Sequence, residues 1–132
     1  NWKRSVGSLK LFGKLLTRLH QDTERKIAVA SITTEDLLET QTEAQEINDV
    51  AEEIFHTSPE LDVLAVLSSH NGSWLGYALS RRAHLLELLK PYHAEGIPHR
   101  VRFQLNNPTI TEAQKELLEF LRTKIPVVSG QA

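Results

Sequence analysis

The chain has 132 residues, of which 40% are hydrophobic and 24% charged, a composition that indicates one folded globular domain and argues against disorder. It contains no cysteine, which excludes disulfides, thiolate nucleophiles and cysteine-based zinc sites. The net charge of −2 is too small to indicate a nucleic-acid or membrane partner by itself. No apolar run approaches the roughly 20 residues of a membrane-spanning helix.

We expect one α/β domain over residues 1–124, followed by a tail over residues 125–132. The chain starts at Asn1 and contains no Met, so we expect it to be a fragment of a longer protein. The absence of cysteine fits the cytoplasm or another reducing compartment. We expect no membrane partner.

The charges are distributed unevenly along the chain. Residues 1–26 carry seven Lys or Arg against two acidic residues, and residues 33–62 carry ten acidic residues and no Lys or Arg. Residues 81–102 are basic again. Such segregation can steer a polyanion to one face of a protein. The alternative is that acidic and basic elements simply pack beside each other on a solvated surface.

The N-terminal third predicts a helix, a strand and a helical segment. Residues 2–21 carry Leu9, Phe12, Leu16 and Leu19 at spacings of three and four, which predicts a helix with these side chains on its buried face. Residues 26–32 predict a short strand. Thr33-Thr-Glu-Asp36 matches a capping box, so we expect a short helical turn near residues 35–39, an exposed link, and a firm helix at about residues 44–55.

The stretch from Leu61 to Arg82 predicts a buried β-hairpin. Two β-prone runs flank Asn71-Gly72, and this dipeptide favours a tight turn in which both residues have positive φ. A helix over residues 81–90 is expected to follow directly.

The last third predicts a strand and a closing helix. Residues 99–105 alternate strictly between polar and apolar, which is typical of a half-buried strand. Thr109-x-x-Glu112 opens a helix whose apolar side is Ile110, Ala113, Leu117 and Leu121. The predicted fold is therefore α+β (α/β-like), with a central mixed sheet of about four strands, flanking helices and the order α-β-α-β-β-α-β-α.

The sequence predicts no catalytic residues and no metal site. The six histidines include no i, i+4 pair on a predicted helix and no HExxH motif. The six glycines are scattered, so no phosphate-binding loop is recognised.

Basic side chains at one strand end are the candidate binding group. Arg81 and Arg82 lie at a predicted strand-to-helix junction, where free backbone amides favour an anion. His99 opens the next strand, from which Arg100 and Arg102 point outward. If the two strands are neighbours, these side chains could converge on a phosphate. The alternative is that outward Arg side chains on an edge strand prevent aggregation.

The order of elements resembles the DHHA1-type accessory domain that follows the catalytic domain in DHH-family phosphoesterases and nucleotidyltransferase relatives. The resemblance covers roughly residues 26–121. The segment EINDVAEEIFHTSPELDVLAVLSSHNGSWLGYALSRR resembles the family's helix and hairpin, and TITEAQKELLEFL resembles its closing helix. Ser80-Arg81-Arg82 stands where the family has an Arg-Ser motif, and residues 94–99 stand where it has a glycine cluster and a histidine.

The resemblance implies a non-catalytic accessory domain that binds a nucleotide or single-stranded nucleic acid. The expected phosphate-binding residues are Arg81, Arg82, Gly96, His99 and Arg102. Only Gly96 and His99 have counterparts in the glycine cluster, and the DHH metal-binding motif is absent. We therefore expect no cofactor in this segment, no activity of the segment alone, and a metal held by a separate catalytic domain.

A second resemblance is to the KH-like domain of DciA-type bacterial helicase-loading adaptors. The sequences LDVLAVLSSHNGSW, RRAHLLELL and VRFQL follow one another in the order of that family. It implies an adaptor, replication-associated or serving oligomerisation, without a nucleotide site. A protein partner would then bind the acidic segment of residues 35–53 and the exposed sheet edge.

Overall fold

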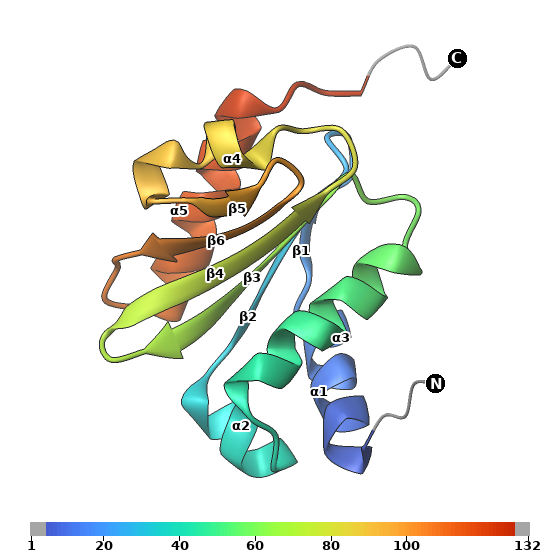
Figure 1. The fold of residues 1–132 in the computed structure, drawn as a ribbon, viewed down its shortest axis with the longest axis vertical. Coiled ribbons are helices and arrows are strands. Elements are labelled where there is room, and N and C mark those ends of the chain that lie inside the picture. Colours follow the sequence, from blue (N-terminus) through green and yellow to red (C-terminus); the bar gives the residue numbers. More distant parts are fainter. Residues whose placement is uncertain (1–4, 129–132) are drawn as a thin grey trace.

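The computed structural model describes residues 5–128, so residues 2–4 of the predicted first helix and residues 129–132 of the predicted tail lie outside it. In chain order the elements are α1 (Val6–Thr17), β1 (His20–Asp22), β2 (Ile27–Ile32), α2 (Thr34–Thr40), α3 (Ala44–His56), β3 (Val63–His70), β4 (Ser73–Ser80), α4 (Leu85–Leu88), the 3-10 turn η1 (Lys90–Tyr92), β5 (Glu95–Ile97), β6 (Arg100–Leu105) and α5 (Ile110–Lys124) (Figure 1).

The predicted α+β class with a central mixed sheet is confirmed. The sheet has six strands in the order β1-β2-β3-β4-β6-β5 rather than about four. The two strands that the sequence did not predict, β1 and β5, have three residues each and form the sheet edges. β2 and β3 pair in parallel, and α2 and α3 make the crossover that a parallel pair requires.

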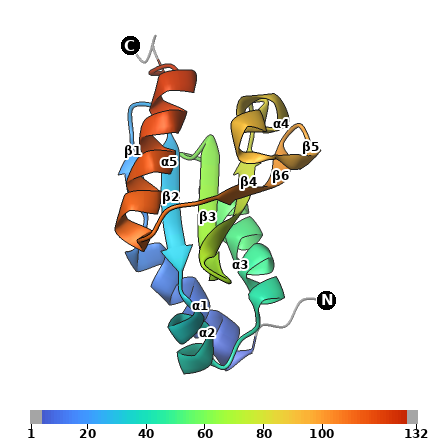
Figure 2. The same cartoon turned by 90° about the vertical axis from the view of Figure 1, so that its left-hand side faces the viewer.

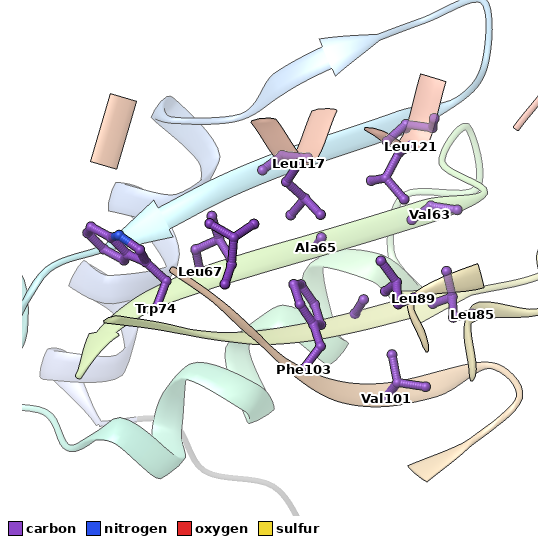
Figure 3. Packing of buried hydrophobic residues seen from close by; sticks show 14 of the residues in the cluster. Val63, Ala65, Leu67, Trp74, Leu85, Leu89, Val101, Phe103, Leu117 and Leu121 are labelled. Atoms are coloured by element: carbon purple, nitrogen blue, oxygen red, sulfur yellow. The ribbon is translucent and has the colours of Figure 1, made fainter. Parts of the chain in front are cut away.

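Two apolar clusters cover the two faces of the sheet. α4 and α5 cover one face, and α1 and α3 cover the other, so α5 and α3 lie on opposite sides of the sheet (Figure 2). Phe103 of β6 lies among side chains of β3, β4 and α5 on the first face (Figure 3). All six residues of β2 are buried because the strand is covered on both faces, which accounts for its nearly continuous apolar sequence.

The hairpin forms as the sequence predicts. β3 and β4 pair from Val63–Ser80 to His70–Ser73, and the two turn residues have positive φ, 47° at Asn71 and 82° at Gly72. The strictly alternating burial of β6 and the buried face of α5 are confirmed as well.

Replacing Gly72 with Ala should lower the free energy of unfolding by about 1–2 kcal/mol, because an L-residue pays this cost in the left-handed region. No atom crowds the position, so backbone conformation is the whole effect. Urea denaturation measures the loss. An unchanged midpoint would contradict the turn geometry.

α1 faces the core differently from the prediction. Its buried residues are Ser8, Leu11 and Leu15, whereas Leu9 and Leu16 are exposed. The predicted apolar side was therefore wrong for these two residues. Both sides of this helix are apolar, so periodicity alone could not identify the side that meets the sheet.

The first described residues after α5 are part of the packed structure. Ile125 is buried in the cluster beneath α5. The amide of Val128 donates to the carbonyl oxygen of Glu24 at 2.8 Å, and Arg25 Nε donates to the Ile125 carbonyl oxygen at 3.0 Å. These bonds hold residues 125–128 against the β1–β2 turn. Among the helices within residues 5–128, none has the length and apolarity to cross a bilayer.

Candidate functional site

The end of the sheet where β3 begins and β4 ends is organised by Asp62. This residue is only 6% exposed. Its carbonyl oxygen accepts the Arg81 amide at 2.9 Å, and its Oδ1 accepts the Arg82 amide at 3.0 Å. The amides expected to be free for an anion are therefore occupied by Asp62. The predicted helix over residues 81–90 is correspondingly shorter, because α4 begins only at Leu85.

The Arg81 side chain is engaged within the fold. Its guanidinium lies 4.0 Å from the centroid of the Phe55 ring and donates to the carbonyl oxygens of Leu61 and Phe55, the latter at 2.7 Å. Arg81 thus fixes the end of α3 and the segment before β3, and it lines neither of the two concave sites described below.

Arg82 lines a cavity of about 490 Å³, here called the basic cavity. Its lining residues are Arg25, Asp62, Arg82, Ala83, His84, Leu88, Lys124, Ile125, Pro126, Val127 and Val128. Three of them are permanent cations, and Asp62 is the one acidic residue that the described chain contributes. Arg82 keeps its side chain 65% exposed while its Nε lies 3.4 Å from Asp62 Oδ1.

Arg25 and Lys124 are the cavity residues that the sequence did not single out. Arg25 lies two residues before β2. Lys124 is the last residue of α5, and α5 packs against β2. Arg25 Nη1 donates to Asp22 at 3.0 Å, and Lys124 Nζ lies 5.6 Å from the Phe120 ring centroid. The sequence signal for Lys124 is the basic last turn of α5. Because α5 packs against β2, this turn lies near the start of β2, where Arg25 is found.

His99 lies beside Ser80 at the end of the sheet. His99 Nδ1 is 3.1 Å from Ser80 Oγ and 3.0 Å from the Ala83 carbonyl oxygen, to which Ser80 Oγ also donates at 2.6 Å. These bonds join the end of β4, the loop after it and the start of β6. His99 lines neither concave site.

Gly96 and Arg102 come together in a second concavity, the α3–β6 groove. It consists of two hollows of about 230 and 380 Å³ that share Asn48, Tyr77 and Arg102. Arg102 Nη2 lies 3.9 Å from Glu95, so the groove is close to neutral there. Gly96 has a φ of 136°, and a Cβ there would lie closer than 3.0 Å to the Arg100 carbonyl oxygen, so the tight β5–β6 connection itself requires glycine.

The floor of the α3–β6 groove contains a polar triad. The Tyr77 hydroxyl donates to Glu52 of α3, and Arg100 Nε lies 3.6 Å from the same carboxylate. Burial, together with the bond to Glu52, raises the pKa of Tyr77. The phenol therefore stays protonated and ties α3 to β4.

Several carboxylates of the acidic segment, residues 35–53, form hydrogen bonds or ion pairs within the fold. Asp36 and Glu39 bind cations of the α1 region, Glu46 accepts a hydrogen bond from Ser8 at 2.7 Å, and Glu52 is the partner of Tyr77. Binding of a protein partner through this segment stays a prediction.

Within residues 5–128, no three His, Asp or Glu side chains gather in a way that could hold a metal ion.

No protein-family model matches the sequence, and no curated protein matches it. Solved structures share its fold. An exopolyphosphatase-related protein from Bacteroides fragilis superposes with a TM-score of 0.79 at 15% identity, over 92% of this chain and 36% of that one. A pGpG-specific phosphodiesterase from Vibrio cholerae gives 0.62 at 11% identity, over 89% and 38%. A DHH domain from a member of a family of ribosomal proteins gives 0.54 at 11% identity, over 92% and 31%.

The fold neighbours are thus DHH-type and phosphoesterase-related proteins. The chain spans only about a third of the length of each of these solved chains.

Proposed function

We propose that the chain is a non-catalytic, substrate-binding accessory domain of a DHH-type phosphoesterase-like protein, and that the basic cavity binds the phosphate of a nucleotide or of single-stranded nucleic acid. The observation that carries this proposal is the gathering of Arg25, Arg82 and Lys124 around one cavity. It is supported by the Ser80–His99 contact at the same sheet end.

The lining of the basic cavity suits an organic phosphate. Its volume of about 490 Å³ lies within the range of small-molecule sites. Arg guanidinium groups match phosphate oxygens, and Lys adds a point charge. Apolar side chains, among them Leu88, Ile125 and Val127, form the remaining wall, against which a sugar or a base can pack.

Asp62 adds an acceptor to this cationic site. Its described hydrogen bonds, both from Arg82, end on Oδ1. A carboxylate at the cavity wall repels a phosphate placed directly on it and accepts a hydrogen bond from a hydroxyl group, as carboxylates do with ribose in dinucleotide sites. We therefore place the phosphate toward Arg25 and Lys124, and the hydroxyl-bearing part of the ligand toward Asp62.

The phosphate contacts proposed for the basic cavity differ from those predicted from the sequence, because Arg25 and Lys124 join Arg82 there. Arg82 stays in the proposed site. Arg81 and His99 bond within the fold at this sheet end, and neither of them lines the basic cavity. Gly96 and Arg102 belong to the α3–β6 groove, where a phosphate contact remains a prediction.

Replacing Arg82 or Lys124 with Ala should weaken binding of adenosine monophosphate and of a short single-stranded oligonucleotide by roughly five- to tenfold each, which corresponds to the loss of one charged contact. Binding should also weaken as salt rises, because phosphate contacts release counterions. Calorimetry and fluorescence anisotropy at several salt concentrations measure both effects.

Lys115→Ala is the matched control, because Lys115 is an exposed lysine on the same helix as Lys124 but lies outside the cavity. It should leave mononucleotide affinity unchanged. Absence of binding by the unmodified chain at low salt would contradict the proposal. So would an equal loss of affinity in Lys115→Ala and Lys124→Ala.

A further inference from the structure

One oxygen of the Asp62 carboxylate accepts none of the described hydrogen bonds. The side chain is only 8% exposed and lines the basic cavity. Its Oδ1 accepts the Arg82 amide at 3.0 Å and lies 3.4 Å from Arg82 Nε. Within residues 5–128, no hydrogen bond ends on Oδ2. A largely buried carboxylate oxygen that loses water without gaining a donor is costly, so Oδ2 favours a ligand that brings one.

The backbone around Asp62 holds this carboxylate in place. The Asp62 amide donates to the Lys26 carbonyl oxygen at 2.8 Å, and its carbonyl oxygen accepts the Arg81 amide at 2.9 Å. The bond from the Arg82 amide to Oδ1 fixes the side chain as well. An acceptor held in this way loses little conformational freedom when a ligand binds, and it discriminates strongly between ligands with and without a donor.

The chemistry of the basic cavity selects a sugar hydroxyl as the donor for Oδ2. The carboxylate repels a phosphate, which Arg25 and Lys124 attract. A base packs best against the apolar wall, which Leu88 and Ile125 help to form. The sugar joins the base to the phosphate, and its hydroxyls are its donors. In a nucleic-acid strand the 3′ oxygen is esterified, so the 2′-hydroxyl is the ribose donor that mononucleotides and strands share.

We propose that Asp62 makes the basic cavity selective for ribonucleotides over deoxyribonucleotides, by accepting a hydrogen bond from the ribose 2′-hydroxyl. This inference rests on the phosphate binding proposed for the same cavity, and it names the class of nucleotide that the cavity takes. A hydrogen bond to a charged acceptor corresponds to a change in affinity of about tenfold or more. Because a deoxyribose leaves Oδ2 without a donor, the cavity should reject it by this factor.

Three mononucleotides test the inference on the unmodified chain. Calorimetry at low salt compares adenosine monophosphate with its 2′-deoxy and 3′-deoxy forms. The 2′-deoxy form should bind about tenfold more weakly, whereas the 3′-deoxy form keeps the 2′-hydroxyl and should bind within about twofold of adenosine monophosphate. All three carry the same phosphate and the same base, so these contacts cancel in the comparison.

Asp62→Asn assigns the selectivity to this carboxylate. The amide oxygen of Asn can still accept the Arg82 amide, but its nitrogen cannot accept a hydroxyl proton. The tenfold preference for adenosine monophosphate over its 2′-deoxy form should therefore fall to about twofold or less. Damage to the fold would weaken binding of both nucleotides and leave their ratio unchanged. Glu87→Gln is the matched control, because it removes an exposed carboxylate of α4 that lies outside the cavity, and it should keep the preference.

The outcomes separate the role of Asp62 from the phosphate site. Equal affinity for adenosine monophosphate and its 2′-deoxy form, weaker binding of the 3′-deoxy form instead, or an unchanged preference in Asp62→Asn would each overturn the role of Asp62 and leave the phosphate site in place. If Asp62→Asn does not fold, the comparison of the three nucleotides on the unmodified chain decides. No binding of any of the three would contradict the proposed function itself, and this inference with it.

Discussion

Replacing Asp36 with Ala is expected to lower the free energy of unfolding by roughly 2–3 kcal/mol, the cost of breaking a largely buried ion pair whose cations are partly solvated. Asp36 is buried at the start of α2 and accepts hydrogen bonds from both terminal nitrogens of Arg18, one of them at 2.9 Å. It also accepts the Thr33 amide at 2.8 Å. The substitution therefore leaves a guanidinium unpaired and removes half of a capping box.

The structural role of Asp36 explains the size of the expected loss. Arg18 follows α1 and also lies 3.4 Å from the carbonyl oxygen of Ser31 at the end of β2. Lys14 Nζ lies 3.4 Å from the same carboxylate. One side chain thus joins α1, the end of β2 and the start of α2.

Urea denaturation at neutral pH measures this loss. Glu39→Gln is a suitable control, because Glu39 also pairs with Lys14, at 2.6 Å, but is 70% exposed. An exposed pair contributes at most about 1 kcal/mol. Equal losses for the two substitutions would contradict the role assigned to Asp36.

The same carboxylate makes the fold acid-labile. The hydrogen bonds from Arg18 hold the pKa of Asp36 well below its usual range, although burial opposes this. For Asp22, burial raises the pKa, but hydrogen bonds from Arg122 and Arg25 outweigh it, and the pKa is lowered. A group whose pKa is lowered by folding stabilises the native state above its unfolded pKa of about 3.9 and loses this contribution as the pH falls below it. Stability should therefore drop from about pH 5 downward.

Asp36→Asn should make this decline shallower, because the amide does not titrate. Denaturation at pH 7, 5 and 3 compares the two chains. Parallel curves would mean that Asp36 does not contribute to the acid sensitivity.

Replacing Gly76 with Ala is expected to cost about 3 kcal/mol, the upper part of the usual range for overpacking a core. Gly76 of β4 pairs with Phe103 of β6, and a Cβ on Gly76 would lie closer than 3.0 Å to the end of the Phe103 ring. Phe103 is 2% exposed and lies in the buried cluster with side chains of α5 and β3 (Figure 3), so the ring can move only if its neighbours shift as well.

A double-mutant cycle tests this contact. Phe103→Leu removes the ring atoms that a Cβ on Gly76 would meet. Gly76→Ala should therefore cost at least about 1 kcal/mol less in the Phe103→Leu background than in the unmodified chain. Gly13→Ala is the control for the glycine substitution itself, because its Cβ meets nothing and helix propensity should stabilise the chain by up to about 1 kcal/mol. Additive losses in the cycle would contradict the packing described for Gly76.

The parts of the fold that the sequence predicted correctly depend on neighbouring residues. Asn71-Gly72 determines its own turn, and Thr33 with Asp36 forms the predicted capping box. The alternation of β6 is visible because one of its faces is buried and the other is exposed. In each case the information lies within a few positions of the element that it specifies.

The predictions of secondary structure fail where residues distant in the sequence determine the local conformation, or where an element is too short to show a pattern. The helix predicted from Arg81 begins only at Leu85, because residues 81–84 form a loop after β4 in which the Arg81 and Arg82 amides bond to Asp62, about 20 positions earlier. The edge strands β1 and β5 have three residues each, too few for a periodic pattern.

The candidate site was only partly predictable for the same reason. Arg82 was identified by its place at the strand end. Arg25 and Lys124 lie about 100 positions apart and meet only because α5 packs along β2 and ends beside its start. Arg81 has the same residue type and the same local signal as Arg82, but it faces Phe55 instead of the cavity.

The central claim is that the basic cavity binds a phosphate ester, and amide NMR spectra recorded during titration with adenosine monophosphate test it most directly. We predict saturable shifts confined to the amides of Arg25, Arg82, His84 and Lys124 and their neighbours, and roughly five- to tenfold weaker saturation of these shifts in Arg82→Ala. Shifts confined to the α3–β6 groove around Gly96 and Arg102, or spectra unchanged by the nucleotide at low salt, would contradict the proposed site.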